Sequence, residues 1–131
     1  MKTVEKIILI ADDDTDQLSI MEANVKSFGF NVCSFQTQKE TEDYLDKNKP
    51  DLAIFDLMMD NKDSGFILSY KLKKKYPDVP VIIATAVTAE TGLVFGLDTQ
   101  NERTWIKADK YMEKGIRKDQ LHKEINKLLK L

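Results

Sequence analysis

The residues best suited to chemistry in this chain are acidic and stand directly after runs of apolar residues. Three aspartates, residues 12–14, follow the apolar run 7–11, and Asp56 follows the apolar run 52–55. Clustered carboxylates repel one another unless a cation lies between them, and a hard divalent ion with oxygen ligands is the natural complement. Mg²⁺ fits this set better than Zn²⁺, because one cysteine and one histidine cannot supply a zinc site.

A hydroxyl and an ammonium group follow two later apolar runs. Thr85 ends the run 81–85, and Lys114 comes shortly after the run 110–112. Ligands of open α/β sheets bind beyond the carboxyl ends of the strands. We therefore expect the acidic groups, this hydroxyl and this ammonium to converge at one edge of a sheet.

Apolar runs of strand length alternate along the chain with segments of helical periodicity. The runs 7–10 and 81–83 lack polar alternation, which is typical of parallel strands covered on both faces. The predicted strands are 6–11, 32–35, 52–55, 81–85 and 110–112, and the predicted helices are 15–28, 38–47, 65–76 and 118–129. The pattern predicts a β-α unit repeated about five times, with helices on both faces of the sheet. Residues 86–109 contain two glycines, and we expect mostly loop with a short or interrupted helix there.

Length and composition predict a single domain, residues 1–131, that folds without a metal or disulfide. The lone Cys33 indicates a reducing compartment, and no apolar run approaches the roughly 20 residues that span a bilayer. We therefore expect a cytoplasmic protein with no membrane contact. A net charge of −2 argues against direct nucleic-acid binding. The only histidine, His122, is expected to be a solvated residue of the last helix.

Four segments, taken together and in order, resemble the receiver domain of two-component response regulators, of the chemotaxis-regulator type. They are IILIADDD (7–14), PDLAIFDLMM (50–59), PVIIATA (80–86) and ADKYMEK (108–114). The resemblance spans nearly the whole chain, and each motif stands at the end of a predicted strand. It implies a flavodoxin-like α/β fold, a doubly wound five-stranded parallel sheet of order 2-1-3-4-5 flanked by about five helices.

The resemblance implies a phosphoryl-accepting site. Asp56 is the implied phosphoacceptor, taking a phosphoryl group from a sensor histidine kinase or a histidine phosphotransfer protein as an aspartyl phosphate. Thr85 would donate its hydroxyl to one phosphoryl oxygen, and Lys114 would pair with another. The chain would thus be a signalling domain that catalyses only its own phosphorylation and slow dephosphorylation.

The resemblance also implies a magnesium site and two residues that set the lifetime of the phosphoryl group. Asp13, Asp56 and the backbone carbonyl of Met58 would hold Mg²⁺, and Asp12 would reach it through water. Met58 and Val87 would flank the path of the attacking water. Both are apolar, so neither can orient that water by hydrogen bonding, and we expect slow self-dephosphorylation.

A conformational switch is the third implication. On phosphorylation, Thr85 is expected to move toward the new charge, and Tyr111 is expected to turn inward into the space released. The surface formed by the fourth helix, the fifth strand and the fifth helix would then change shape for a partner. The output partner or output domain is not identified by the sequence, and a homodimer stays open. The alternative for Tyr111 is an ordinary half-buried aromatic residue of a strand.

The chain departs from the receiver pattern in three places. Asp60 stands where receivers have a proline, and Gly65 comes one residue late, so the loop after the acceptor is longer. Gly115 follows Lys114, where receivers commonly carry a proline in a cis peptide. The segment between Thr85 and Lys114 is also longer than most receivers need, so the geometry of the output surface cannot be transferred from the family.

Three other functions fit parts of the sequence. A degenerate receiver that only binds proteins is disfavoured by the intact acids, Thr85 and Lys114, but Gly115 and the displaced Gly65 leave it open. An aspartate-nucleophile, magnesium-dependent phosphatase would carry a second aspartate two residues after the nucleophile, where this chain has Met58. A flavin- or nucleotide-binding module would need a glycine-rich loop after the first strand, where this chain has aspartates.

Overall fold

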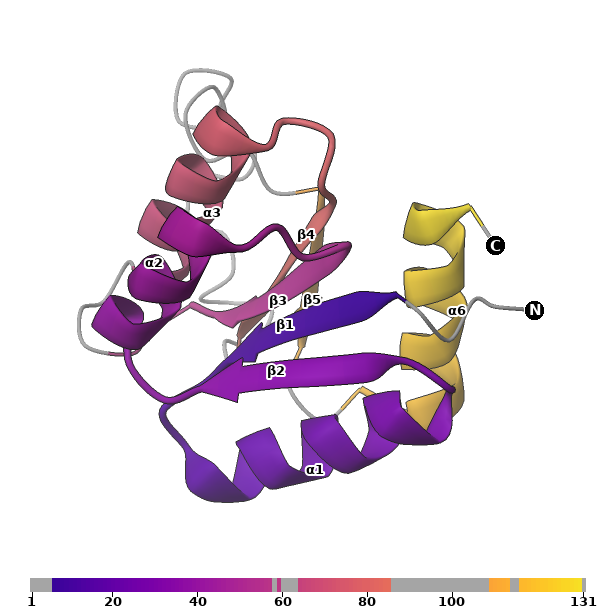
Figure 1. The fold of residues 1–131 in the computed structure, drawn as a ribbon. Coiled ribbons are helices and arrows are strands. Elements are labelled where there is room, and N and C mark those ends of the chain that lie inside the picture. Colours follow the sequence, from indigo (N-terminus) through magenta and orange to yellow (C-terminus); the bar gives the residue numbers. More distant parts are fainter. Residues whose placement is uncertain (1–5, 58, 60–63, 86–108, 114–115, 131) are drawn as a thin grey trace.

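A five-stranded parallel sheet forms the centre of the molecule, with helices on both of its faces (Figure 1). The computed structural model describes residues 6–57, 59, 64–85, 109–113 and 116–130. The strands are β1 (Ile7–Ala11), β2 (Asn31–Phe35), β3 (Leu52–Asp56), β4 (Val81–Thr85) and β5 (Lys110–Glu113). Their order, β2-β1-β3-β4-β5, confirms the predicted flavodoxin-like arrangement.

Four helices are found in the described residues, two on each face of the sheet. They are α1 (Thr15–Ser27), α2 (Gln38–Lys47), α3 (Ser64–Lys75) and α6 (Lys118–Leu129). Figure 1 shows α1 and α6 on one face and α2 and α3 on the other. The expected loop and short helix at 86–109 lie outside the described residues, except for Asp109. None of the helices in the described part is long and apolar enough to cross a membrane.

The sheet divides the apolar core into two clusters because successive side chains of a strand point to opposite faces. In β1, Ile8 joins Leu18 of α1 and Leu121 of α6, whereas the next residue, Leu9, joins Leu68 of α3. All five of these side chains are buried. Burial on both faces is the physical reason for the uninterrupted apolar runs in the sequence.

Local sequence signals fix the two ends of α1. Asp14 is the N-cap, and its side chain accepts hydrogen bonds from the backbone N–H groups of Asp16 and Gln17 at 3.0 and 3.2 Å. After the helix, Gly29 has a φ of 98°, a left-handed conformation in which a side chain would be strained. The third aspartate of the run 12–14 therefore has a structural role.

Two other aspartates hold the amino-terminal edge of the sheet. Asp51 Oδ2 accepts a hydrogen bond from the backbone N–H of Ile7 at 2.7 Å, and Asp109 Oδ2 accepts one from the N–H of Val81 at 2.8 Å. Asp109 also forms a 2.7 Å salt bridge with Lys73, whose side chain is only 13% exposed. These carboxylates accept hydrogen bonds from the first backbone amides of β1 and β4.

The prediction for His122 is wrong. Its imidazole is half-buried and stacks on the ring of Phe28, with ring centroids 4.1 Å apart and planes 4° from parallel. Phe28 is the C-cap residue of α1, so the contact joins α1 to α6 on the same face of the sheet. Cys33 of β2 is half-buried and packs against the core cluster on the α2–α3 side.

The tyrosine of α2 is expected to titrate late. Burial, together with the neighbouring Cys33 and Asp51, raises the pKa of Tyr44 to about 12 from a normal value of 10.0. Because the unfolded chain ionises first, the free energy of unfolding should be unaffected below pH 10 and fall between pH 10 and about 12. Absorbance at 295 nm should show an ionisation step near pH 12 that is absent from Tyr44→Phe. If the ionisation step that Tyr44→Phe removes had its midpoint near pH 10, this expectation would be contradicted.

Candidate functional site

Three carboxylates meet at the carboxyl-terminal edge of the sheet, as the sequence predicts. One side-chain oxygen from each of Asp12, Asp13 and Asp56 can be chosen so that all lie within 4.8 Å of one another. The parallel pairing of β1 with β3, in which Ala11 lies opposite Phe55, brings the residues after these two positions together. The cluster is therefore a direct product of strand register.

The three carboxylates differ in burial. Asp12 and Asp56 are 8% and 5% exposed, whereas Asp13 is exposed to solvent. Asp12 Oδ1 accepts a hydrogen bond from the N–H of Asp14 at 2.9 Å, which fixes its orientation. Asp56 takes part in other interactions, but its buried Oδ2 atom receives no hydrogen bond from the part of the chain that the structure describes. Negative charge is thus gathered on two buried carboxylates and on a third, Asp13, that faces water.

The donor set fits a hard divalent cation. Mg²⁺ binds oxygen at about 2.0–2.1 Å in an octahedral shell, so two of its ligand oxygens lie at most about 4.2 Å apart. The three carboxylate oxygens lie within 4.8 Å of one another, so small side-chain rotations or one bridging water can complete such a shell. Nearby carboxylates at low exposure are costly without a compensating positive charge, which is the role that a cation would fill.

The remaining residues of the expected site are only partly described. Thr85 is the last residue of β4 and lies opposite Glu113 in the register with β5, so its backbone ends at the same edge of the sheet as Asp56. Its side chain lies outside the described part of the structure. Met58, Val87 and Lys114 also lie outside it, as does the Lys114–Gly115 peptide bond. Their roles stay predictions.

Tyr111, the expected switch residue, lies in β5 and is half-buried. Its ring packs edge-on against Phe66 of α3, with centroids 6.3 Å apart and planes at 70°. It belongs to the side of the core that α2 and α3 cover. This contact connects the fifth strand with the helix that follows the acceptor strand.

Gly65 is the point where α3 meets the acceptor strand. Its N–H donates to the carbonyl of Leu57 at 2.8 Å. A Cβ at this position would lie 2.8 Å from the carbonyl oxygen of Asp56 and 2.8 Å from the Cα of Leu57. Although this glycine comes one residue later than receivers have it, its position requires the absence of a side chain.

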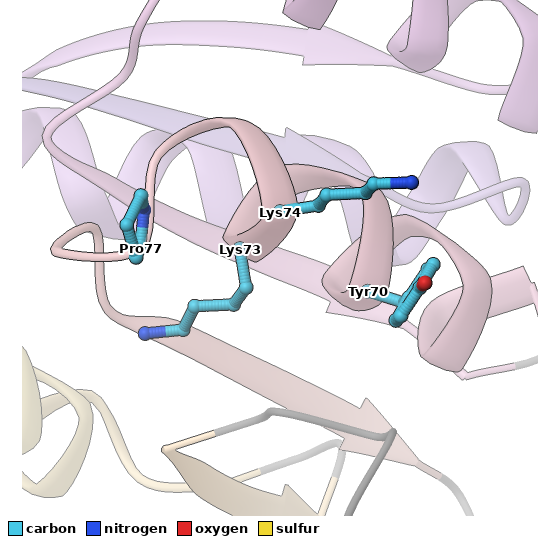
Figure 2. A pocket seen from close by; sticks show the side chains of 4 residues that line it. All are labelled: Tyr70, Lys73, Lys74 and Pro77. Atoms are coloured by element: carbon cyan, nitrogen blue, oxygen red, sulfur yellow. The ribbon is translucent and has the colours of Figure 1, made fainter.

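A hollow of about 530 Å³ lies away from the carboxylates, against the second half of α3. Among the described residues, Tyr70, Lys73, Lys74 and Pro77 line it (Figure 2). Ser64 begins α3 beside Leu57, and at 1.5 Å per residue Lys74 lies about 15 Å further along the helix. The candidate site is therefore the strand edge and not this hollow.

Sequence reasoning missed the polar partners of the first turn of α3. Ser64 Oγ donates a hydrogen bond of 2.8 Å to Gln38 Oε1, across 26 positions of sequence. Gln38 and Glu42, also hydrogen-bonded at 2.7 Å, have the i, i+4 spacing of a helical pair. That spacing is the only signal in the sequence that could have drawn attention to them.

Comparison with known proteins agrees with this geometry. The family described as "Response regulator receiver domain" matches residues 8–126. The regulatory protein VanR of Enterococcus faecium is 32% identical over 110 residues, which cover 84% of this chain and 44% of VanR. The chain therefore spans less than half the length of that relative.

Solved structures extend the agreement to three dimensions. A CheY-like receiver domain protein from Methanospirillum hungatei superposes with a TM-score of 0.80 at 26% identity, covering 96% of this chain and 94% of that chain. A receiver domain of a Francisella response regulator gives a TM-score of 0.77 at 25% identity, covering 96% and 98%. With strand order, acidic strand ends and sequence match in accord, this chain belongs to the family of response regulator receiver domains.

Proposed function

We propose that this receiver domain accepts a phosphoryl group on Asp56 in a magnesium-dependent reaction. The observation that carries the proposal is the convergence of Asp12, Asp13 and Asp56 at one edge of the sheet, with carboxylate oxygens within 4.8 Å of one another. A carboxylate oxygen of Asp56 attacks phosphorus and the bond from phosphorus to the donor breaks. When the donor is a phosphohistidine, the imidazole nitrogen keeps the electron pair of the broken bond.

The chain's own residues bind and position the reacting groups. Asp12, Asp13, Asp56 and the carbonyl of Met58 are the proposed holders of Mg²⁺, which supplies charge stabilisation for the phosphoryl oxygens when bound. The N–H of Asp14 orients the carboxylate of Asp12 by donating to its Oδ1. Asp13, exposed at the rim, lies where an ion arrives from solvent.

The hydroxyl of Thr85 and the ammonium of Lys114 are the proposed partners of the phosphoryl oxygens. Thr85 ends β4 next to the acceptor strand, and Lys114 directly follows the last residue of β5. The positions of both residues are therefore expected for the same reason as those of the acids, because each follows the carboxyl end of a parallel strand. Thr85 and Tyr111 are the proposed switch, and the T-shaped contact of Tyr111 with Phe66 offers a route from the acceptor side to β5.

The proposed donors are a sensor histidine kinase or a histidine phosphotransfer protein. The output partner is proposed to bind the surface formed by the expected fourth helix, which falls outside the described residues, together with β5 and the last helix, α6. Because the chain matches only 44% of VanR, an output domain or a separate output protein is equally compatible with the comparison.

The proposal is tested by mass spectrometry of the intact protein after incubation with acetyl phosphate. With Mg²⁺ present, we expect a gain of one phosphoryl group, and peptide mapping should locate it on Asp56. Chelation of the metal with EDTA should prevent the gain. A protein that binds Mg²⁺ but is never labelled would be the degenerate, protein-binding receiver, and would overturn the proposal.

The phosphoryl group is expected to be long-lived. Neither Met58 nor Val87 can hydrogen-bond an attacking water, so hydrolysis without a phosphatase should take minutes or longer. Following the loss of mass after removal of acetyl phosphate measures this lifetime. Met58→Gln, which adds a hydrogen-bonding amide, should shorten it. A half-life of seconds for the unsubstituted protein would contradict the expectation.

A further inference from the structure

Four polar side chains join α2 to α3. We refer to Gln38 and Glu42 of α2, with Ser64 and Lys71 of α3, as the α2–α3 network. Gln38 is at its centre: its Nε2 donates to Glu42 Oε2 at 2.7 Å, and its Oε1 accepts from Ser64 Oγ at 2.8 Å. Lys71 Nζ donates to the same oxygen of Glu42 at 3.0 Å. The network therefore runs from a solvent-exposed ion pair to the first residue of α3.

The two ends of the network differ in burial and hence in strength. The side chains of Lys71 and Glu42 are 52% and 25% exposed, and an ion pair of this kind contributes little to stability. Ser64 is fully buried, where a hydrogen bond is stronger and its loss costs more. Of the two bonds that the network makes to α3, the one from Ser64 to Gln38 is thus the stronger.

Glu42 orients the amide of Gln38. Burial raises the pKa of Glu42, but hydrogen bonds from Gln38 and Lys71 more than offset this and hold the pKa below its normal value of 4.5. The carboxylate therefore stays ionised near neutral pH and attracts the NH₂ group of Gln38. That orientation directs the carbonyl oxygen of Gln38 toward Ser64.

The buried end of the network is next in sequence to the residue of α3 that contacts the backbone after the acceptor strand. Ser64 is followed by Gly65, whose N–H bonds to the carbonyl of Leu57 at 2.8 Å. The same glycine lies so close to the peptide between Asp56 and Leu57 that a single added carbon would be 2.8 Å from it. A displacement of Ser64 must therefore move either Gly65 or the backbone that follows Asp56.

We propose that Gln38 is a positioning residue for the Asp56 site: by holding Ser64, it fixes the start of α3 and so the backbone on which the phosphoacceptor stands. This inference rests on the proposed function and extends it to a residue that touches neither metal nor phosphoryl group. Gln38 acts through Ser64 and Gly65. Its loss weakens magnesium binding without removing any ligand.

Two measurements on Gln38→Ala test the inference. Amide hydrogen exchange of Gly65 should become several-fold faster, because the bond to Leu57 is less well held. The Kd for Mg²⁺ from calorimetry should rise about 3–10-fold, less than the 10–100-fold typical when a group bonded directly to a ligand is lost. Asp43→Asn is the matched control, since it removes only an exposed α2 ion pair to Lys39 and should change neither value.

A charge swap provides the rescue. In the double variant Gln38→Glu, Glu42→Gln, the carboxylate at position 38 can accept from Ser64 and from the amide at position 42. Both readouts should return to within about twofold of the unsubstituted protein, by the logic of a double-mutant cycle. A merely structural role in helix packing predicts changes in exchange at Gly65 alone, with the same Kd for Mg²⁺ in all of these variants.

The outcomes separate this inference from the proposed function. Unchanged exchange at Gly65 in Gln38→Ala overturns the positioning role, whatever the metal does. Faster exchange with an unchanged Kd shows that Gln38 holds α3 without affecting the site, and also overturns it. If the unsubstituted protein binds no Mg²⁺, the proposed function fails, and the inference fails with it because no site remains to be positioned; an exchange effect seen alone would then identify a stability contact.

Discussion

An Asp56→Asn variant is expected to gain no phosphoryl group from acetyl phosphate under conditions in which the unsubstituted protein gains one. The amide is close to the carboxylate in size but carries no charge and is a poor nucleophile, so the step that forms the acyl phosphate is lost. Asp56 is 5% exposed at the end of β3, and the isosteric change should leave the fold intact. Intact mass spectrometry measures the result.

Two controls make this result interpretable. Asp43→Asn, the same chemical change at an exposed position of α2, should be labelled like the unsubstituted protein. Far-ultraviolet circular dichroism of Asp56→Asn should retain the helical signal of the original. Equal labelling of Asp56→Asn and the unsubstituted protein would refute the acceptor assignment.

Gly65→Ala is expected to lower the free energy of unfolding by about 1–3 kcal/mol, the usual cost of forcing an extra carbon into a packed site. On an exposed helix the same change would raise stability by up to about 1 kcal/mol, so the sign itself is diagnostic. The difference arises because the new Cβ would lie 2.8 Å from two backbone atoms, Asp56 O and Leu57 Cα. Backbone cannot rotate away as a side chain can. Urea denaturation measures the loss, and phosphorylation should slow in parallel.

Ser69→Ala is the matched control in the same helix. The hydroxyl of Ser69 is fully buried and has no hydrogen-bond partner within the described ranges, so its removal eliminates a desolvation cost. We expect unchanged stability or a gain of about 1 kcal/mol. If Gly65→Ala were as stable as Ser69→Ala, the close approach of α3 to the acceptor strand would be disproved.

Much of the fold could be predicted from the sequence because burial on both faces leaves a clear pattern. The runs 7–10 and 81–83 became β1 and β4, and each strand boundary lies within one residue of the expected position. Helix signals were equally local: Asp14 caps α1, and Gly29 adopts the positive φ that ends it. Such features depend on neighbours in sequence, so a linear reading can find them.

The carboxylate cluster was also predictable, because parallel strands end at a common edge. The differences in burial and hydrogen bonding among its aspartates were not predictable, since they depend on which backbone N–H group reaches which carboxylate oxygen. Asp14 is engaged by the first turn of α1, whereas Asp12 and Asp13 remain with Asp56. The capping aspartate and the proposed metal-binding aspartates are the same residue type at adjacent positions, so the sequence does not distinguish them.

Contacts between distant segments could not be predicted. His122 was expected in solvent, but Phe28 lies under it on another helix, and helical periodicity does not reveal what a neighbouring helix presents. The bond from Ser64 to Gln38 has the same origin, because it exists only once α2 and α3 pack side by side. The sequence shows only that Gly65 comes one residue later than in other receivers. The reason that this position needs a glycine is its tertiary contact with the backbone of Asp56 and Leu57.

Aspartates at the two ends of the strands have opposite environments, so charge is distributed unevenly between the two edges of the sheet. At the amino ends, Asp51 and Asp109 are compensated by the amides of Ile7 and Val81. At the carboxyl ends, negative charge is gathered and left facing water at Asp13. Of the aspartates in the described residues, those at this rim are the ones placed to attract a divalent ion, so on the proposed function the protein can bind its metal before any partner protein arrives.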